Sequence, residues 1–248
     1  PSWSPNGDKI AFIGNDGSKG DLYLFDIETH QINNLTNDWY SEDHVSWAPD
    51  GESIYFISDR GDDLSIGQKE IPYNYNIDQS DIYTLNLESF SISRLTNTTW
   101  NETYPTVSGD GNYLAYISDE SGVANIMLLI DDTSTPITNV ATGITQLSWN
   151  GDDTQLIFTG FYSSGYDIFT LANPKEKRNE NISIPITSWR EVDDDHGLLR
   201  RSEAGGWNRI DDNEFRNYVF SNLDLNENIS DSAKVELDED LTKDEGGH

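Results

Sequence analysis

Short, almost continuous apolar runs recur at intervals through the first two thirds of the chain. Four of them share a core of aliphatic and aromatic residues, and they occupy 9–13, 53–57, 113–117 and 155–159. Runs of this length are typical of strands covered on both faces. A second β-rich segment follows each run, at 21–24, 81–84, 125–128 and 167–170. The pattern predicts repeated strands and very little helix, because no long segment has helical apolar periodicity.

A turn motif precedes each apolar run and identifies a repeat. The motif reads SWSPNG at 2–7, SWAPDG at 46–51, TVSGDG at 106–111 and SWNGDD at 148–153. Proline followed by Asn or Asp favours a type I turn, and the glycine after them adopts a positive φ at little cost. Each motif therefore predicts a tight hairpin. Measured at its second position, the motif recurs after 44, 60 and 42 residues.

Four strands in each unit account for this period, and a Leu-Thr or Ile-Thr pair closes the first three units, at 35–36, 95–96 and 137–138. Four-stranded units that repeat at this spacing are the pattern of a β-propeller blade. We expect an all-β fold of four four-stranded antiparallel blades over 1–174, divided at 1–38, 39–98, 99–140 and 141–174. The 60-residue interval exceeds 44 by 16 residues, and we place this insertion at 62–79, in the second blade.

Residues 175–248 lack the repeat and hold 10 basic and 19 acidic residues. Charge runs at 193–195 and 236–240 predict an acidic, largely irregular tail or linker. Short ordered pieces are expected at 182–186 and 218–220, and the first is a candidate to close one further partial blade.

The four units together resemble the TolB-like propeller repeat, which is related to the WD40-like repeats. The second unit matches best, through 47–51, Ser58-Asp59-Arg60, 81–83 and Leu95-Thr96, whereas the third lacks the Trp and Pro and the fourth lacks the Pro and closing Gly. The resemblance covers residue 1 to about residue 174. It implies an extracytoplasmic protein, periplasmic or associated with the outer membrane, in which one propeller face holds a protein or peptide. Because the chain begins within a motif, at Pro1, we expect it to be a fragment of a larger propeller.

Fifteen basic and 45 acidic residues give the chain a net charge of −30. This charge would repel phosphate backbones and anionic membrane surfaces, so we expect neither a nucleic-acid partner nor membrane binding. No apolar run approaches the roughly 20 residues that span a bilayer, so direct membrane insertion is not expected. The charge is consistent with solubility, with adaptation to salt, or with weak calcium binding by clustered carboxylates. We expect no cofactor, and calcium binding that is weak at most, because EF-hand spacing is absent.

The sequence contains no motif of a catalytic site. It has no G-x-S-x-G elbow, H-E-x-x-H, P-loop or G-x-G-x-x-G, and the absence of cysteine excludes thiolate chemistry. We therefore expect no enzymatic activity from this chain. The recurrent Asp21, Asp81 and Asp167 are expected to cap turns, and the recurrent Trp3, Trp47 and Trp149 to pack between blades rather than bind a ligand.

The loops between blades and the loops after the second strands are expected to emerge on one face. These loops combine aromatic side chains with carboxylates and one arginine, the residue types of interface centres. Two interpretations remain open, because the aromatics either anchor a partner or pack beneath their own loops. The candidate residues of this binding face are Trp39, Tyr40, Asp43, Asp59, Arg60, Trp100, Glu102, Tyr104 and Asp119.

Three functional hypotheses follow from the repeat and this face. The first is a non-catalytic platform of the bacterial cell envelope that binds a protein or peptide. The second is the propeller of a larger peptidase or peptidase-associated envelope protein whose catalytic domain lies outside this chain. The third is a glycan-binding propeller that uses the aromatics as sugar platforms. The sequence flanking this chain in its parent gene would separate the first two, and a glycan array would test the third.

Overall fold

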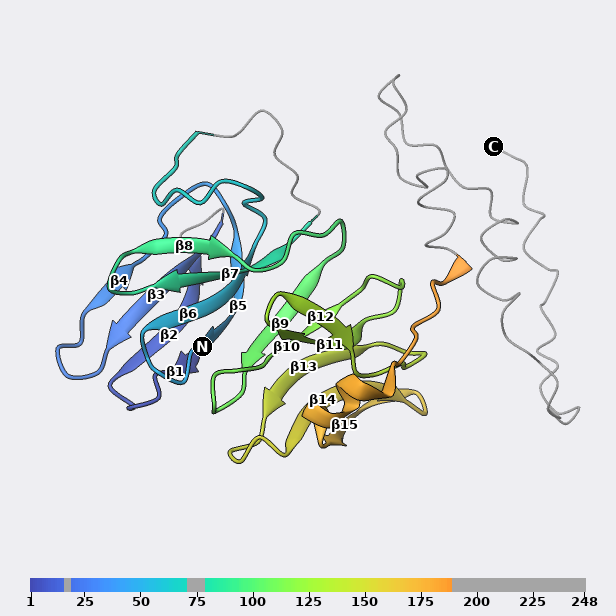
Figure 1. Cartoon of the computed structure of the whole chain (residues 1–248). Helices are drawn as coiled ribbons and strands as arrows, with labels where there is room; N and C mark the ends of the chain where they lie inside the picture. Colours follow the sequence, from blue (N-terminus) through green and yellow to red (C-terminus); the bar gives the residue numbers. More distant parts are fainter. Residues whose placement is uncertain (16–18, 71–78, 189–248) are drawn as a thin grey trace, which may run out of the picture. The chain divides into compact units, whose positions relative to one another are not determined.

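The structure, a computed structural model, describes residues 1–15, 19–70 and 79–188 (Figure 1). The chain divides into two compact units, residues 1–195 and 196–248, and all described residues belong to the first. This unit is built from antiparallel sheets whose strands follow one another in chain order. Two short helical turns lie wholly within the described residues, α1 (Pro174–Lys177) and the 3₁₀ turn η1 (Arg178–Glu180).

Four sheets correspond to four successive stretches of the chain. Blade 1 contains β1 (Ser2–Trp3), β2 (Lys9–Asn15), β3 (Gly20–Asp26) and β4 (Ile32–Asn34). Blade 2 contains β5 (Glu42–Trp47), β6 (Ser53–Ser58), β7 (Asp81–Asn86) and β8 (Ser91–Arg94). Blade 3 contains β9 (Glu102–Val107), β10 (Leu114–Ser118), β11 (Asn125–Ile130) and β12 (Thr133–Pro136). Blade 4 contains β13 (Ile144–Trp149), β14 (Gln155–Tyr162) and β15 (Gly165–Ala172).

The recurrent turn motif forms the hairpin between the first and second strands of each blade. Gly7, Gly51 and Gly111 adopt φ of 75°, 74° and 76°, and each donates its N–H to the carbonyl three residues earlier, at 2.9–3.0 Å. In blade 4, which lacks this glycine, Asp153 takes its place with φ of 59° and donates to the Asn150 carbonyl at 3.2 Å. The predicted hairpin turn therefore forms in all four blades, although Asp153 takes the place of glycine in blade 4.

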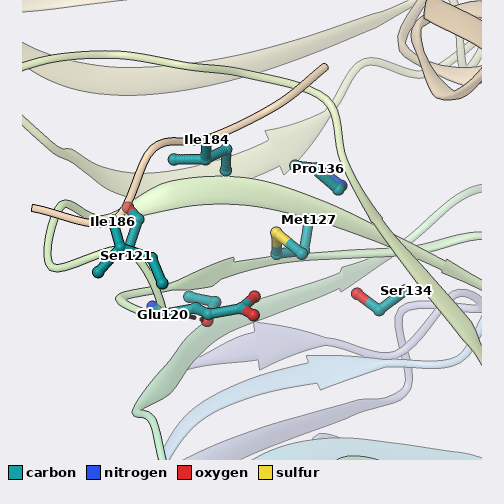
Figure 2. Close-up of a pocket in the computed structure, with 8 residues that line it drawn as sticks. Glu120, Ser121, Met127, Ser134, Pro136, Ile184 and Ile186 are labelled. Carbon is teal, nitrogen blue, oxygen red and sulfur yellow. Dashed lines mark hydrogen bonds between the residues drawn. The ribbon is translucent and has the colours of Figure 1, made fainter. Parts of the chain in front are cut away.

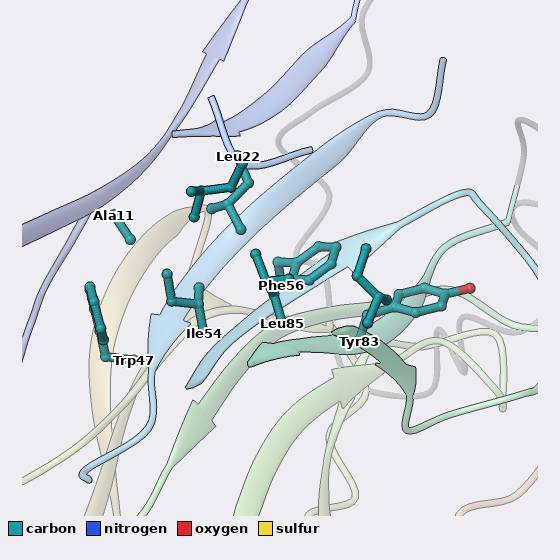
Figure 3. Packing of buried hydrophobic residues seen from close by; sticks show 9 residues of the cluster. Ala11, Leu22, Trp47, Ile54, Phe56, Tyr83 and Leu85 are labelled. Atoms are coloured by element: carbon teal, nitrogen blue, oxygen red, sulfur yellow. The ribbon is translucent and has the colours of Figure 1, made fainter. Parts of the chain in front are cut away.

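Successive blades pack face to face, and Figure 3 shows this packing between blades 1 and 2. Trp47 lies in the cluster with Ala11 and Leu22 of blade 1, and its indole Nε1 donates to the Ser2 carbonyl at 3.0 Å. Trp149 repeats the contact between blades 4 and 3, where its Nε1 donates to the Thr106 carbonyl at 3.1 Å. The expected blade-to-blade packing is thus observed for these two tryptophans, whereas Trp3 is 61% exposed.

The part of the chain after β15 returns to blade 3. Lys175 of α1 bonds the carboxylates of Asp110 and Asp153 at 2.7 and 3.4 Å. Farther along, Thr187 donates its backbone N–H and its hydroxyl to the Ser121 carbonyl, at 2.8 and 2.9 Å. The segment 182–186, a candidate to close a further blade, therefore lies against blade 3, and the sheet of blade 4 has three strands among the described residues.

The observed fold confirms the all-β prediction of antiparallel propeller blades. The described residues include no helix that is both long and apolar enough to cross a bilayer. The expected piece at 218–220, the charge runs at 193–195 and 236–240, and part of the insertion at 62–79 lie outside the described residues.

Candidate binding face and the polar network beneath it

One polar unit recurs wherever two blades meet. It combines a residue at the start of a blade's third strand, the threonine of the closing pair, and the first residue of the next blade's first strand. The three units are Asp21–Thr36–Glu42, Asp81–Thr96–Glu102 and Asn125–Thr138–Ile144, all buried. In each, the threonine hydroxyl accepts the backbone N–H of the residue after the first member, at 2.9–3.1 Å. The closing threonine of the sequence repeat therefore joins the last turn of a blade to its third strand.

The first member of each unit also holds the loop that leads to the next blade. Asp21 accepts the backbone N–H of Asp38 at 3.3 Å, Asp81 that of Thr98 at 3.2 Å, and Asn125 that of Val140 at 2.8 Å. Asp21 and Asp81, which were expected to cap turns at their own strands, instead fix inter-blade loops 17 residues farther along the chain, and Asn125 does the same over 15 residues. Asp167, the third aspartate of that expectation, is exposed.

Between blades 1 and 2, the network contains a buried guanidinium. Arg60 Nη2 lies 2.5 Å from Glu42 Oε1 and 3.2 Å from Asp38 Oδ2, and all three side chains have no exposed surface. The guanidinium carbon also lies 5.2–5.8 Å from the ring centroids of Tyr40, Phe56 and Tyr83. Because arginine combines planar donors with stacking on rings, it satisfies this polar and aromatic pocket at once.

The carboxylates of this first interface outnumber its single guanidinium. Burial raises the pKa of Glu42 to about 7 even though the Arg60 charge opposes the shift. Burial also raises the pKa of Asp38, again against the effect of Arg60. An excess of buried negative charge favours retention of a proton on one of these carboxyl groups. The net negative charge of the interface is therefore smaller than the number of its acidic residues suggests.

Between blades 2 and 3, the compensating arginine lies at the margin of the network. Arg94 of β8 bonds Asp81 on one side and the exposed Asp62 on the other. Glu102 receives hydroxyl bonds from Thr98 at 2.7 Å and Thr96 at 3.4 Å. Burial, with a contribution from the charge of Asp81, raises the pKa of Glu102 to about 8.

Between blades 3 and 4, the same positions carry no charge. Asn125 replaces the aspartate and Ile144 replaces the glutamate, while Thr138 still donates to Asn125 Oδ1 at 3.0 Å. Ile144 joins the apolar cluster around Ile126 and Ile137. The geometry of the unit therefore survives without ions.

Three carboxylates of the first interface, Asp21, Asp38 and Glu42, offer oxygen atoms within 4.8 Å of one another. Their oxygens already accept bonds from Thr36 and from Arg60, whose charge lies inside the cluster. The arrangement is that of an internal ion-pair network, and a divalent cation would have to displace the guanidinium.

A β-bulge recurs in the first strand of blades 2, 3 and 4, next to the inter-blade loops. The bulges fall at His44, Tyr104 and Gln146, with φ of 46°, 51° and 54°. The rings of His44 and Tyr104 meet with centroids 3.8 Å apart. His44 Nδ1 is buried and, within the described residues, has no hydrogen-bond partner. Bulges commonly redirect a side chain at a functional site, and positive φ at such residues stores strain.

The nine predicted face residues separate into two groups. Asp43 is exposed, and Trp39, Asp59, Trp100, Tyr104 and Asp119 are half-buried. Tyr40, Arg60 and Glu102 are buried, with 0%, 3% and 1% of their surface exposed. These last three residues belong to the polar network between the blades, and their buried side chains do not reach the surface of the face.

The half-buried aspartates of this set hold the loops in place. Asp59 accepts the backbone N–H of Ser41 at 2.9 Å, and Asp119 that of Asn101 at 2.8 Å. Trp39 lies beneath Lys19, whose Nζ is 5.6 Å from the ring centroid. The surface left to a partner centres on Asp43, His44 and Tyr104. No feature of the sequence marks His44, because only the strand register reveals the bulge that carries it.

A separate hollow of about 260 Å³ lies on the outer part of blade 3 (Figure 2). Ser118, Glu120 and Met127 form one side. The other side is covered by Ile184 and Ile186 of the returning segment, residues 173–188, which follows β15. Figure 2 shows Ile184 above Met127, with the Glu120 carboxylate directed into the space below. The chain's own segment thus covers this hollow.

Comparison with known proteins identifies the class of fold. No protein-family model matches the chain. Among solved structures, TolB from Acinetobacter baumannii superposes with a TM-score of 0.57 at 20% identity, over 73% of this chain and 41% of that one. A protein described as TolB from Agrobacterium tumefaciens gives 0.56 at 18%, over 69% and 60%. Puromycin hydrolase gives 0.53 at 14%, over 72% and 27%.

The structure is therefore a TolB-like β-propeller in its fold, as the repeat predicted. The chain spans about 41% to 60% of the length of the two TolB structures. Identities of 20% or less show the fold alone, so binding and activity rest on the residues of this chain.

Proposed function

We propose that this chain is a non-catalytic platform of the bacterial cell envelope that binds a protein or peptide through the face around His44. The observation that carries the proposal is the bulge pair of His44 and Tyr104, where a buried ring nitrogen has no hydrogen-bond partner among the described residues and the neighbouring Asp43 is exposed. The envelope location rests on the resemblance to the TolB-like repeat.

The chemistry of the face favours a partner rich in hydrogen-bond donors and positive charge. Burial lowers the pKa of His44, so its ring is neutral near pH 7 and does not repel a cationic partner. Asp43 stands exposed beside it. The net charge of −30 would attract a basic segment and speed its association at low salt.

A rigid support under the face favours binding over catalysis. The inter-blade loops are fixed from below by Asp21, Asp81, Asp59 and Asp119. A preorganised loop loses little conformational freedom when a partner binds. No step of a chemical reaction is assigned to these residues.

The test uses a labelled short Lys/Arg-rich peptide and the full chain. We expect saturable one-to-one binding by fluorescence anisotropy, weakened about tenfold or more by His44→Phe, which keeps a ring at this position and removes the acceptor. Asp43→Asn is expected to weaken binding less. Asp152→Asn is the matched control, because Asp152 is an exposed carboxylate in the turn after β13, at the other end of the first strands. If His44→Phe and Asp43→Asn both bind as the parent does, the face is not the binding site.

The alternative proposal is the propeller of a larger peptidase or peptidase-associated protein. It is supported by the similarity to puromycin hydrolase, which superposes with a TM-score of 0.53 over 27% of that chain. In that case the face around His44 would meet a catalytic domain outside this chain. The sequence on either side of the chain in its parent gene discriminates the two proposals. The glycan-binding hypothesis is the weaker third, because Trp39 and Trp100 are half-buried in their loops.

A further inference from the structure

A hollow of about 310 Å³ lies between the hairpin turns of blades 1 and 2, at the end of the first strands that points away from the inter-blade loops. Trp47 lines it together with three carboxylates, those of Asp8, Glu52 and Glu88. Lys9 also lines the hollow, but its ammonium is bonded to Asp8 at 2.8 Å. Glu52 and Glu88 are exposed, and neither carboxylate has a bonding partner within the described residues. The hollow therefore combines an indole ring with an excess of negative charge.

The interface between blades 3 and 4 contains a corresponding cleft, which the chain fills with a lysine of its own. Lys175 Nζ lies 5.8 Å from the ring centroid of Trp149 and 4.7 Å from that of Tyr113. The same ammonium bonds Asp110 and Asp153, which belong to the hairpin turns of blades 3 and 4. An ammonium within about 6 Å of an aromatic centroid gains a cation–π attraction in addition to its ion pairs. The occupant of this type of cleft is thus a lysine side chain.

Backbone hydrogen bonds place the two clefts at equivalent positions of their blades. Leu87 follows β7 and donates its N–H to the Glu52 carbonyl at 2.9 Å, as Asn173 follows β15 and donates to the Thr154 carbonyl at 2.8 Å. The tryptophans that end β5 and β13 are equivalent as well, because each donates to a carbonyl of the preceding blade. From this shared point blade 2 turns into β8, whereas the chain of blade 4 continues to Lys175. The cleft between blades 1 and 2 keeps the ring and the acids, and among the described residues no ammonium lies over its tryptophan.

We propose that the hollow beside Trp47 binds a lysine side chain of a partner protein. The aliphatic stem of that lysine packs against Trp47 and Leu87, and its ammonium meets Glu52 and Glu88 at the rim. Both carboxylates are unpaired among the described residues, so the incoming charge displaces no internal ion pair. The site lies at the opposite end of the first strands from His44, and it is therefore separate from the face of the proposed function.

A titration of the full chain with Nα-acetyl-lysine N-methylamide tests the proposal, because this probe presents a lysine side chain as a polypeptide does. The indole N–H signals of the tryptophans report binding in two-dimensional NMR spectra. One side chain supplies few contacts, so we expect the Trp47 signal to shift with a Kd on the order of millimolar. Nα-acetyl-norleucine N-methylamide, which keeps the stem and lacks the ammonium, should leave this signal in place.

Charge-neutral variants of the rim locate the ammonium. Glu52→Gln and Glu88→Gln should each weaken binding about threefold, because each removes one exposed ionic partner and leaves the core intact. Asp132→Asn is the matched control and should bind as the parent does. Asp132 is exposed in the corresponding turn of blade 3, where β9 ends in Val107 and supplies no indole.

The counterpart cleft allows a gain of binding to be measured. Lys175→Ala removes the internal ammonium, so the lysine probe should shift the Trp149 signal in this variant and not in the parent. His44→Phe should leave the Trp47 response unchanged, which separates a failure of this site from a failure of the proposed function. A Trp47 signal that ignores the probe, or that responds equally to the norleucine compound, overturns the proposal. Tighter probe binding after Lys234→Met and Lys243→Met would assign the cleft to a lysine of this chain and overturn the assignment to a partner.

Discussion

The interface between blades 1 and 2 and the interface between blades 2 and 3 are built on one plan but neutralise their buried charge in different ways. The first encloses Arg60 completely, between Glu42 and Asp38. The second places Arg94 at its margin, with its side chain 14% exposed and one of its bonds made to Asp62 in solvent. Glu102 is left to hydroxyl donors.

This difference teaches that the repeat conserves hydrogen-bond geometry rather than charge. The threonine bond to the third strand is present at all three interfaces, including the one where Asn125 and Ile144 replace the acids. The interfaces differ in how negative charge is neutralised or avoided. The first encloses an arginine, the second retains a proton on Glu102, and the third has uncharged residues at these positions.

The largest expected effect is on Arg60. Arg60→Met should lower the free energy of unfolding by about 3–5 kcal/mol, because it leaves buried carboxylates without their partner. Arg94→Met should cost less, about 1–2 kcal/mol, since Asp81 retains other donors and solvent is near. Urea unfolding followed by tryptophan fluorescence compares the two variants. Equal losses would contradict the distinction between an enclosed and a marginal arginine.

The next effect is a difference in pH dependence. The folded state raises the pKa of Glu102 from 4.5 to about 8, so between these values it holds a proton that the unfolded chain releases. The free energy of unfolding from this group therefore falls as the pH rises from about 4.5 to about 8, by up to about 1.4 kcal/mol per pH unit.

Glu102→Gln should flatten this slope in denaturant titrations at several pH values. Glu42→Gln should flatten it less, because the pKa of Glu42 rises only to about 7 against the charge of Arg60. If Glu42→Gln removes the larger part of the slope, the assignment of the retained proton to the second interface is wrong.

The smallest expected effect is the loss of unfolding free energy when Tyr40 keeps its ring and loses only its hydroxyl. Tyr40 is fully buried beside Arg60, and its hydroxyl donates to Asp63 Oδ2 at 2.6 Å. Tyr40→Phe keeps the ring and should cost about 1 kcal/mol of unfolding free energy. Tyr83→Phe, which removes a similar bond to the Gly61 carbonyl at 2.7 Å, is the matched control in the same melts. A much larger loss for Tyr40 alone would mean that the Asp63 contact anchors the whole loop.

The fold was predictable because its signals are local and repeated. Turn residues within each SWxPDG-type motif determine the hairpin, and the apolar runs determine which strands are buried. The networks were not predictable, because Asp21 meets Thr36 and Glu42 only after three strands fix the register. The same reasoning explains why Tyr40, Arg60 and Glu102 were candidates for an exposed face although they are buried, since their partners come from other parts of the chain. The bulge at His44 leaves no mark in the pattern of residues.

The returning segment changes how the stack of blades should lose its structure. In a purely linear repeat array each unit contacts only its neighbours, and both end units are free to fray. Here Lys175 rests over the rings of Tyr113 and Trp149, at 4.7 and 5.8 Å from their centroids, and Thr187 is bonded to Ser121. These contacts tie blades 3 and 4 into one cooperative unit. Blades 3 and 4 are therefore expected to open together rather than one after the other.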